Sequence, residues 1–362
     1  MRSSKTKDQK ILFFSRGKGR GHAVPDAAIA NTLKTLEPSL SITFVSYSTG
    51  ATTLSQLGQN VIDIQLPEDN PVWETSICVT QILRELPQNT LVISHEEFAA
   101  VPFSKAFGFT TLFLTDWFTY PDSLQMRALR FADEILFLDE PGLYDEPPYL
   151  SSKIYYIGVV LRDLASKSAD KTEWRLRAGI PVDATVLLVC PGGAAIHSEA
   201  ASPILDLVIG AYDILDFPRK YLLWLTDGPD FDLIATRFDG RADLRVLKPH
   251  FDFTGTLLTA DLVITKGNRL PLFECEALSI PSLSISSGHN PIDDFRVGQI
   301  HSNKALRRRG LTSTTLKMHM ANALGSSSKL RSEIQSTFEV SQPRYAAAER
   351  LQYWLRSTQE IG

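Results

Sequence analysis

Short apolar runs alternate with longer amphipathic stretches along almost the whole chain. Runs of about four to eight apolar residues indicate strands, and apolar residues recurring every three to four positions indicate helices. This alternation predicts β-α-β units and therefore parallel sheets. In the first half it predicts strands at Ile11–Ser15, Ser41–Ser46, Val61–Ile64, Leu91–Ser94, Thr111–Thr115, Glu134–Leu138 and Lys153–Ile157, and helices at Ala23–Leu36, Trp73–Leu86, Glu97–Phe107 and Asp122–Phe131.

The pattern starts again in the second half, after a polar, charged segment, Arg162–Lys171, that is the best candidate for a linker. From Ser313 onward the sequence is helical in character only, and Tyr345–Ser357 carries an apolar stripe that needs a surface to pack on. Between these segments the pattern predicts strands at Thr185–Cys190, Tyr221–Thr226, Leu262–Thr265 and Ser282–Ser286, and helices at Thr172–Ala178, Ser198–Leu215, Asp252–Thr259 and Leu270–Leu278.

The length of 362 residues agrees with two domains, at roughly 100–200 residues each. Two parallel α/β halves are expected to face each other across a cleft, because ligands of such sheets bind at the carboxyl ends of the strands. The boundaries expected from the pattern are 1–160 for the N-terminal domain, 161–340 for the C-terminal domain and 341–362 for a separate terminal helix.

The composition narrows the class of protein. With 43% hydrophobic and 22% charged residues the chain is neither disordered nor fibrous, and a net charge of −4 gives no reason to expect nucleic acid as a partner. The longest apolar runs are much shorter than the roughly 20 residues of a membrane span, and the polar N-terminus is no secretory signal. We therefore expect a cytoplasmic protein whose three distant cysteines, Cys78, Cys190 and Cys275, are reduced thiols rather than metal ligands or disulfides.

The loop after the first predicted strand carries the most specific chemistry. It reads Arg16-Gly17-Lys18-Gly19-Arg20-Gly21-His22 and leads directly into a helix. Alternating glycines permit a tight turn and the close approach of a ligand, and a helix N-terminus offers free N–H groups to an anion. The three cations favour a phosphate-bearing ligand, although solvated loop charges and a simple structural turn are alternatives. A dinucleotide site is disfavoured, because no acidic residue ends the second strand at Ser46-Tyr47-Ser48.

Four segments, in order, resemble the GT-B glycosyltransferases, and most closely family 28. The first is Gly19–Ala30, in which Pro25 follows His22 by three positions. The others are Gly158-Val159-Val160-Leu161-Arg162, the strand to Cys190 followed by Pro191-Gly192-Gly193-Ala194-Ala195, and Ile264-Thr265-Lys266 with Glu274 nine positions after Thr265 and a gapless match through Pro281. The resemblance spans about residues 11–300.

The resemblance implies a GT-B fold of two Rossmann-like domains whose C-terminal helix packs back on the N-terminal domain. It implies an inverting, metal-independent transfer of a hexose from a nucleotide sugar, most simply a UDP-sugar, to a hydroxyl acceptor, with no cofactor. The N-terminal domain would bind the acceptor and the C-terminal domain the donor. The residues expected to bind nucleotide sugar or phosphate are Gly19, Gly21, Arg162, Gly192, Gly193, Ala194, Lys266, Arg269, Glu274, Asp293 and Asp294.

Three residues are candidates for catalysis, because the reaction needs a base that takes the proton of the acceptor hydroxyl. His22 is the first candidate, since imidazole titrates near neutral pH. Glu96, at the end of the strand that runs into Ser94-His95-Glu96-Glu97, is expected to orient His22 or to act as the base. Asp116 ends the next strand in the same way. For each, a structural role such as a helix cap is the alternative.

Several features depart from the family pattern or leave the function open. Asn268, Arg269 and Leu270 replace the family's glycines, and Asp293-Asp294 stands where relatives pair an acid with an amide, so the donor sugar is not determined. The Asp230-Phe231-Asp232 pattern gives little support for a metal, and Arg307-Arg308-Arg309 is interpreted as a solvated helix face.

The acceptor stays open between a small molecule and a lipid. A lipid acceptor would bring peripheral contact with the inner face of the membrane near Trp117, Phe118 and Tyr120. The alternatives to a transferase are a nucleotide-sugar hydrolase or epimerase on the same fold, and a non-catalytic subunit that binds a sugar nucleotide.

Overall fold

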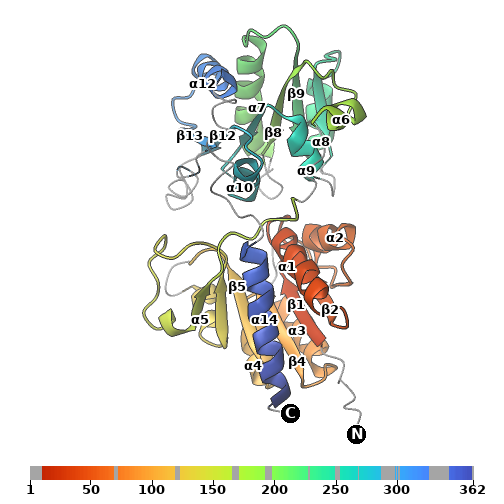
Figure 1. The fold of residues 1–362 in the computed structure, drawn as a ribbon, viewed down its shortest axis with the longest axis vertical. Coiled ribbons are helices and arrows are strands. Elements are labelled where there is room, and N and C mark those ends of the chain that lie inside the picture. The colour runs from red at the N-terminus through yellow and green to blue at the C-terminus, as the bar shows by residue number, and fades with distance from the viewer. Residues whose placement is uncertain are drawn as a thin grey trace. The chain divides into compact units, whose positions relative to one another are not determined.

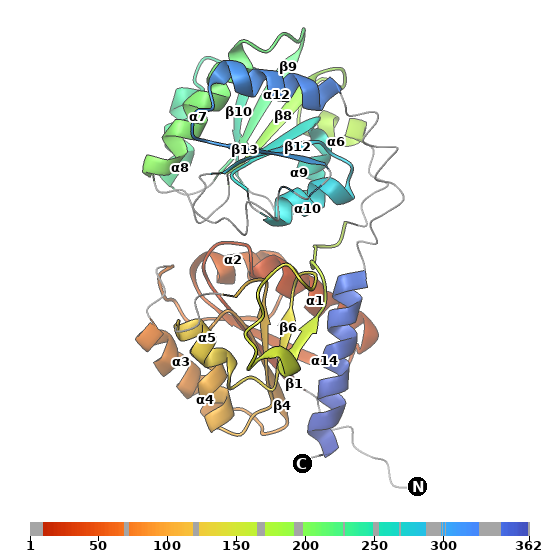
Figure 2. The same cartoon turned by 90° about the vertical axis from the view of Figure 1, so that its left-hand side faces the viewer.

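In a computed structural model the chain forms two compact units, which we call the N-terminal unit (residues 1–162 and 340–362) and the C-terminal unit (residues 163–339). Each consists of a parallel β-sheet with helices on both faces (Figures 1 and 2). The structure describes residues 10–68, 72–118, 123–164, 171–191, 198–226, 229–248, 253–267, 269–286, 298, 300, 302–325 and 342–360.

The N-terminal unit contains a seven-stranded parallel sheet in the order β3-β2-β1-β4-β5-β6-β7. The order reverses between β1 and β4, which pair in register from Lys10 opposite Thr90 to Ser15 opposite His95. The strands are β1 (Lys10–Ser15), β2 (Ser41–Ser46), β3 (Val61–Asp63), β4 (Thr90–His95), β5 (Thr111–Thr115), β6 (Glu134–Phe137) and β7 (Ile154–Tyr156). The helices are α1 (Ala23–Leu36), α2 (Ser48–Gln56), α3 (Val72–Arg84), α4 (Ala100–Ala106), α5 (Leu124–Leu129) and the 3₁₀ turn Ser151–Lys153.

The central strands are buried on both faces because helices cover the sheet from either side, which explains their continuous apolar runs. Ile11 and Phe13 of β1 face a core that includes Leu33 of α1, whereas Leu12 and Phe14 face a second core with Val79 of α3. Both cores together fix the position of β1 and of the loop that follows it.

The last helix, α14 (Gln342–Glu360), belongs to the N-terminal unit and lies beside α1 (Figures 1 and 2). Ala347, Leu351 and Leu355 of α14 are fully or almost fully buried in the same core as Leu33. The Glu134 carboxylate at the start of β6 binds this helix by accepting hydrogen bonds from the Arg350 guanidinium and, at 2.7 Å, from the Trp354 indole. The apolar stripe of the tail therefore has its packing surface.

The C-terminal unit repeats the arrangement with a six-stranded sheet in the order β10-β9-β8-β11-β12-β13. Here the order reverses between β8 and β11, which pair from Leu187 opposite Leu262 to Cys190 opposite Thr265. The strands are β8 (Thr185–Cys190), β9 (Lys220–Leu225), β10 (Leu244–Leu247), β11 (Leu262–Thr265), β12 (Ser282–Ser286) and β13 (Asn303–Arg307). The helices are α6 (Lys171–Arg177), α7 (Ser198–Asp213), α8 (Pro229–Arg237), α9 (Phe253–Thr259), α10 (Arg269–Ala277) and α12 (Ser313–Gly325).

A buried ion pair holds the amino end of this second sheet. Asp261, just before β11, accepts hydrogen bonds from Lys171 at 2.6 Å, Arg175 at 2.5 Å and the backbone N–H of Val186 at 2.8 Å. Arg175 is 5% exposed and also donates to two backbone carbonyls, so its charge is fully partnered. These contacts lie at the end of the sheet opposite the carboxyl ends of the strands.

The predicted fold class is confirmed: two parallel α/β halves, with a C-terminal helix that returns to the first half. The sequence pattern missed α2, α8, β10 and β13, which are short or largely polar. The interpretation of Arg307–Arg309 as a helix face was wrong, because Arg307 ends the edge strand β13 and the next residues form a turn.

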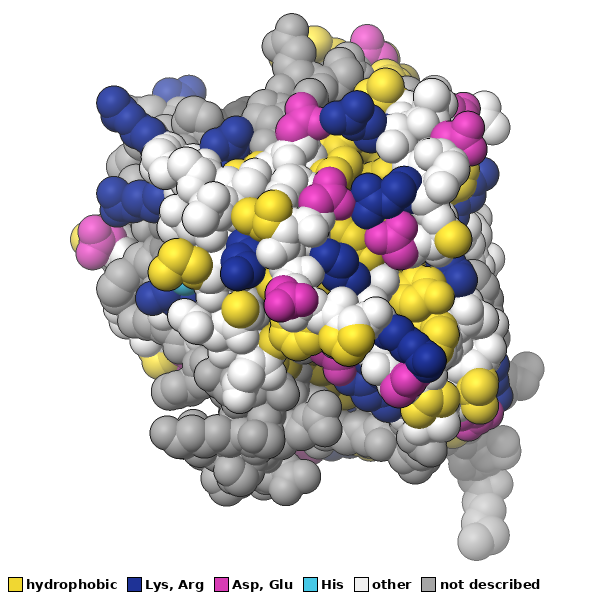
Figure 3. All heavy atoms as spheres, turned by 90° about the horizontal axis from the view of Figure 1, so that it is seen from above, with side chains coloured by type: hydrophobic (Ala, Val, Ile, Leu, Met, Phe, Trp, Pro, Cys, Tyr) yellow, Lys and Arg dark blue, Asp and Glu magenta, His cyan; other side chains and the backbone are white. Residues whose placement is uncertain are grey.

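None of the described helices combines the length and apolar character needed to cross a bilayer. Figure 3 looks onto one end of the molecule, where side chains of both charge signs are interspersed among apolar ones. The described residues visible in this view therefore present no extended field of a single sign.

Candidate active site

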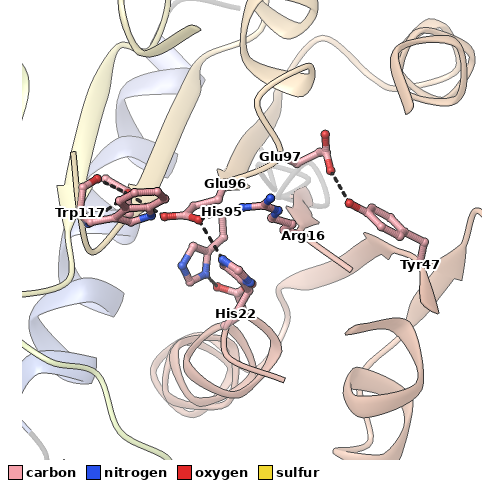
Figure 4. Close-up of polar contacts among 9 residues, drawn as sticks. Arg16, His22, Tyr47, His95, Glu96, Glu97 and Trp117 are labelled. Carbon is pink, nitrogen blue, oxygen red and sulfur yellow. Dashed lines mark hydrogen bonds and ion pairs between the residues drawn. The ribbon is translucent and has the colours of Figure 1, made fainter. Parts of the chain in front are cut away.

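The candidate active site of the N-terminal unit lies at the reversal point of the first sheet. The loop after β1 supplies Arg16 and His22, the residues just after β4 supply Glu96 and Glu97, and β5 ends in Thr115. Because all these strands are parallel, their carboxyl ends meet at one edge, and the reversal of strand order leaves a crevice there in open α/β sheets. Figure 4 shows the side chains converging from these segments.

The three glycines of the first loop have different structural roles. A Cβ on Gly17 would lie 2.3 Å from the Tyr47 ring and 2.3 Å from its carbonyl oxygen, so only glycine fits at this packed position. Gly19 has a φ of +67°, a left-handed conformation that glycine adopts without strain. Gly21 has neither a positive φ nor an atom within 4 Å of such a Cβ, so neither its backbone conformation nor its packing requires a glycine there.

His22 is the N-cap residue of α1 and contacts the buried carboxylate of Glu96, with 3.0 Å between Nε2 and Oε2 (Figure 4). An ionised carboxylate only accepts hydrogen bonds, so Nε2 carries the proton and, in neutral His22, Nδ1 is the basic nitrogen. Nδ1 has no hydrogen-bond partner among the described residues. The ring therefore has one nitrogen fixed by Glu96 and a second, buried nitrogen that no described residue contacts by a hydrogen bond.

Glu96 is 3% exposed and is surrounded by donors. Its Oε1 accepts the Thr115 hydroxyl at 2.8 Å, and its Oε2 lies 3.4 Å from the Arg16 guanidinium as well as close to His22. Burial alone would raise the pKa of Glu96, but the hydrogen bond and charge of His22, together with His95 and Thr115, lower it below the usual value. A carboxylate held ionised in this way is suited to orienting His22 rather than to taking up the acceptor proton.

The backbone of Glu96 is strained, with a φ of +55°. Such a conformation costs a non-glycine residue about 1–3 kcal/mol and is concentrated at functional sites. Successive side chains of a strand point to opposite faces, and the left-handed turn at Glu96 breaks that alternation. It allows His95 and Glu96 to face α1 together.

A second carboxyl, Glu97, lies on the other side of Arg16 and accepts the Tyr47 hydroxyl at 3.4 Å (Figure 4). Burial raises the pKa of Glu97 to about 7, even though Arg16 and the Tyr47 hydrogen bond act to lower it. Arg16 also lies 5.6 Å from the centre of the Phe98 ring. Arg16 is therefore engaged within the site, unlike the exposed Lys18, and is less suited to the expected phosphate role.

Other predicted residues have the following places in the N-terminal unit. Asp116 is half-buried after β5, and its charge acts on His95. Gly19 is buried, and its N–H donates to the Glu68 carboxylate at 3.3 Å. Arg162 is half-buried in the last segment of this unit. The Trp117 carbonyl accepts the Thr115 hydroxyl at 2.9 Å, the Phe118 ring is tilted by 31° against the Phe137 ring with 4.7 Å between ring centres, and Tyr120 lies outside the described residues.

In the C-terminal unit the predicted nucleotide residues lie around the reversal point between β8 and β11. Lys266 follows β11, Gly267 turns there with a φ of +90° and donates to the Thr265 hydroxyl at 3.0 Å, and Arg269 begins α10. Glu274, one turn from the end of α10, is completely buried. Gly192, Gly193, Ala194, Asp293 and Asp294 lie outside the described residues.

No catalytic or ligand-binding role was predicted for five residues that complete the polar network: Asp26, His95, Thr115, Tyr47 and Glu97. The usable signal is position: His95 and Glu97 end or follow β4, the neighbour of β1, Thr115 ends β5, the next strand of the sheet, and Asp26 follows His22 by one helical turn. Within the described ranges, no group of three or more His, Cys, Asp or Glu side chains is arranged to hold a metal ion. None of the three cysteines forms a disulfide.

Two sheets of this topology, with a C-terminal helix returning to the first unit, define the GT-B fold of glycosyltransferases and related sugar-nucleotide enzymes. No protein-family model matches the chain. It is 22% identical over 327 residues to the UDP-N-acetylglucosamine–N-acetylmuramyl-(pentapeptide) pyrophosphoryl-undecaprenol N-acetylglucosamine transferase of Acetivibrio thermocellus, covering 85% of each chain.

Solved structures agree on the fold. The UDP-GlcNAc 2-epimerase of Neisseria meningitidis matches with a TM-score of 0.72 at 12% identity, over 96% of this chain and all of that one. The glycosyltransferase SnogD of Streptomyces nogalater matches with 0.66 at 15% identity, over 96% of this chain and all of that one. MurG of Acinetobacter baumannii matches with 0.58 at 13% identity, over 98% of this chain and all of that one. These similarities confirm the GT-B fold and the resemblance to family 28.

Proposed function

We propose that this chain is an inverting glycosyltransferase that moves a hexose from a nucleotide sugar, a UDP-sugar by preference, to a hydroxyl acceptor. The observation that carries the proposal is the His22–Glu96 pair at the reversal point of the first sheet, with Nε2 fixed by the carboxylate and Nδ1 unpartnered. The resemblance to a UDP-N-acetylglucosamine transferase over most of both chains supports it.

In the proposed reaction the acceptor oxygen attacks the anomeric carbon while His22 Nδ1 takes the hydroxyl proton. The bond between the anomeric carbon and the phosphate oxygen breaks, and the nucleoside diphosphate leaves with the electron pair. Glu96 stabilises the imidazolium that forms, as a carboxylate does when it orients a histidine base. Attack from the face opposite the leaving group inverts the configuration at that carbon.

We assign the acceptor to the N-terminal unit and the donor to the C-terminal unit. Lys266, Arg269, Arg162 and the segment Gly192–Ala194 would neutralise or cradle the diphosphate, Glu274 would bind the ribose hydroxyls, and Asp293 and Asp294 would contact the sugar. Asp116 stays a candidate beside the base. The proposal includes transfer without a bound metal ion or cofactor, as the GT-B resemblance implies, and activity should therefore persist in excess EDTA.

The acceptor class is the finer part of the proposal. The Acetivibrio thermocellus relative acts, by its name, on an undecaprenol-linked acceptor. A lipid-linked acceptor for this chain would require peripheral contact with the inner face of the membrane, and transfer to acceptor in vesicles would then exceed transfer to a short-chain analogue. Equal rates would favour a small-molecule acceptor.

The test is incubation of the purified chain with UDP-sugars, with and without a panel of alcohols and lipid-linked sugars, and identification of the products. A glycoside of inverted configuration supports the transferase. Free sugar formed at the same rate without an acceptor would establish a hydrolase, and an isomeric UDP-sugar would establish an epimerase.

Nucleotide binding is tested separately by melting temperature. A ligand at 100 times its dissociation constant adds about 2.7 kcal/mol to the free energy of unfolding. Glu274→Ala should weaken UDP binding by roughly 1.5–3 kcal/mol, the value of a charge-assisted hydrogen bond. Unchanged affinity in this variant would remove Glu274 from the donor site, and no stabilisation by any UDP or dTDP nucleotide would contradict all three enzyme activities.

A further inference from the structure

A second histidine–carboxylate pair lies directly behind His22. His95, the last residue of β4, donates from Nδ1 to Oδ1 of Asp26 at 2.7 Å. Both are almost completely buried, at 3% and 0% exposure. The His95 ring meets the His22 ring edge to face, with 4.7 Å between ring centres and 79° between their planes (Figure 4).

The two pairs together clamp one turn of α1. His22 and Asp26 are four residues apart, so their side chains lie on the same face at the start of the helix. Their partners, Glu96 and His95, are consecutive residues that face α1 together only because of the left-handed backbone at Glu96. The end of β4 thus holds the start of α1 at two points, the His22–Glu96 contact and the Asp26–His95 contact. The His22 ring lies against the His95 ring.

The His95 ring lies among carboxylates on several elements: Asp26 on α1, Glu96 after β4 and Asp116 after β5, with the His22 ring beside it. Burial alone would lower the pKa of His95, but Asp26, followed by Glu96 and Asp116, raises it above the usual value. A buried ion pair of this kind is costly to form, and replacement of one partner is strongly destabilising. Burying these charges therefore costs more free energy than packing α1 against β4 requires, since apolar residues could supply the same packing.

We propose that Asp26 and His95 are positioning residues for the base. Asp26 fixes the plane of the His95 ring, and the His95 ring fixes the orientation in which His22 presents Nδ1 to the acceptor hydroxyl. This inference rests on the proposed function, because it assigns the pair to the same reaction. It accounts for a buried charged pair that makes no contact with the reacting atoms.

The experiment compares the full chain with Asp26→Asn, which keeps the shape of the side chain but removes its charge. His95→Asn is the second variant: its amide can still donate to Asp26, but the ring beside His22 is gone. Asp261→Asn, the same chemical change at the buried ion pair of the C-terminal unit, is the control. Chains labelled with ¹⁵N-histidine report the charge and tautomer of each ring by NMR, with His22→Gln and His95→Asn identifying the signals.

In the wild type we expect the titration of His95 to lie above its usual range, because the Asp26 carboxylate accepts from Nδ1, and the neutral form of His22 to carry its proton on Nε2. In Asp26→Asn the titration of His95 should move to lower pH, whereas His22 should keep its proton on Nε2, because the Glu96 carboxylate still accepts a hydrogen bond there. Misplacement of a base by about 1 Å can cost 10²-fold in rate, so kcat should fall at least about tenfold in both variants with both KM values unchanged. Asp261→Asn should lower the melting temperature without this loss of kcat.

A wild-type kcat in either variant would overturn the inference. So would a loss of activity that only follows the fraction of folded protein. If the wild type transfers no sugar, the proposed function fails, and the NMR measurements still decide whether Asp26 sets the protonation of the His95 ring beside His22.

Discussion

His22, Glu96 and Arg16 show how burial selects the protonation state of single residues. A carboxylate in a low-dielectric interior is unfavourable unless donors surround it, and Glu96 has three. Its charge in turn fixes which nitrogen of His22 carries a proton. Arg16 lies between two carboxyls whose pKa values are shifted in opposite directions. The pKa of Glu96 is lowered, and that of Glu97 is raised to about 7.

At this scale we predict that His22→Ala lowers turnover by about 10²–10⁴-fold, the usual contribution of a general base. Nucleotide affinity should stay near that of the wild type, because His22 belongs to the acceptor unit. Steady-state kinetics and UDP titration by calorimetry measure the two effects. A fall in UDP affinity instead would make the first loop a donor element and place the base elsewhere.

The raised pKa of Glu97 predicts how the free energy of unfolding depends on pH. Its pKa is about 7 in the folded chain and 4.5 in the unfolded one, so between these values the folded state keeps a proton that the unfolded state has lost. The free energy of unfolding must therefore fall as pH rises through this window, and the penalty is complete above it. Glu97→Gln removes the penalty and should be more stable than the wild type at pH 8 by up to about 3 kcal/mol.

Urea unfolding at pH 5 and pH 8 checks this prediction, because the two proteins should be similar at the lower pH. Glu96→Gln is the matched comparison: the lowered pKa of Glu96 stabilises the fold above the unfolded-state value, and that stabilisation is lost as pH falls. Parallel pH profiles for wild type and Glu97→Gln would show that Glu97 does not titrate in this range.

At the scale of elements, the first loop is determined by what packs behind it. Gly17 passes the Tyr47 ring, and the N–H of Gly50 at the start of α2 donates to the Gly17 carbonyl at 2.9 Å. The loop is thus built against β2 and α2, elements that come later in the sequence. The glycine pattern is therefore only partly a ligand signature.

The matched variants Gly17→Ala and Gly21→Ala separate these roles. Gly17→Ala should destabilise the protein by about 1–3 kcal/mol or more, because its Cβ would overlap the Tyr47 ring and backbone. Gly21→Ala should leave the melting temperature unchanged and weaken acceptor binding or turnover. A fully active Gly21→Ala would mean that no ligand approaches the loop at this position.

At the scale of the molecule, the N-terminal unit is assembled from two distant parts of the chain. The α14 helix buries Ala347, Leu351 and Leu355 in the core that contains Leu33. Two side chains of α14 also share the Glu134 carboxylate, and Arg350 lies 4.7 Å from the Tyr155 ring. The first 162 residues alone would expose an apolar face along α1, and the returning helix covers it.

We therefore predict that Glu134→Ala lowers the free energy of unfolding of the N-terminal unit by about 1.5–3 kcal/mol, the value of a hydrogen bond to a charged group. Hydrogen exchange should show faster opening of α14 and α1, with no change in the C-terminal unit. Arg219→Ala, which breaks an exposed ion pair with Asp183, is the control and should cost less than about 1 kcal/mol. Equal effects of the two substitutions would show that Glu134 does not anchor α14.

The sequence by itself determined the fold class, the order of most strands and helices, and the loop, histidine and glutamate on which the family resemblance depends. These features are local: apolar periodicity, glycine spacing and the residues that end strands can all be recognised within short windows. Polar elements such as α2 and the edge strand β13 were missed because packing, rather than their own pattern, stabilises them.

Only the tertiary structure decided which polar residues meet. His22 and Glu96 are separated by 74 residues and Asp26 and His95 by 69, and they come together because β1 and β4 pair at the reversal of strand order. No local pattern encodes that Glu97 holds its proton, that Arg16 is engaged by Glu96, or that His95 lies behind His22. Those properties follow from burial and from neighbouring charges, which exist only once the sheet has formed.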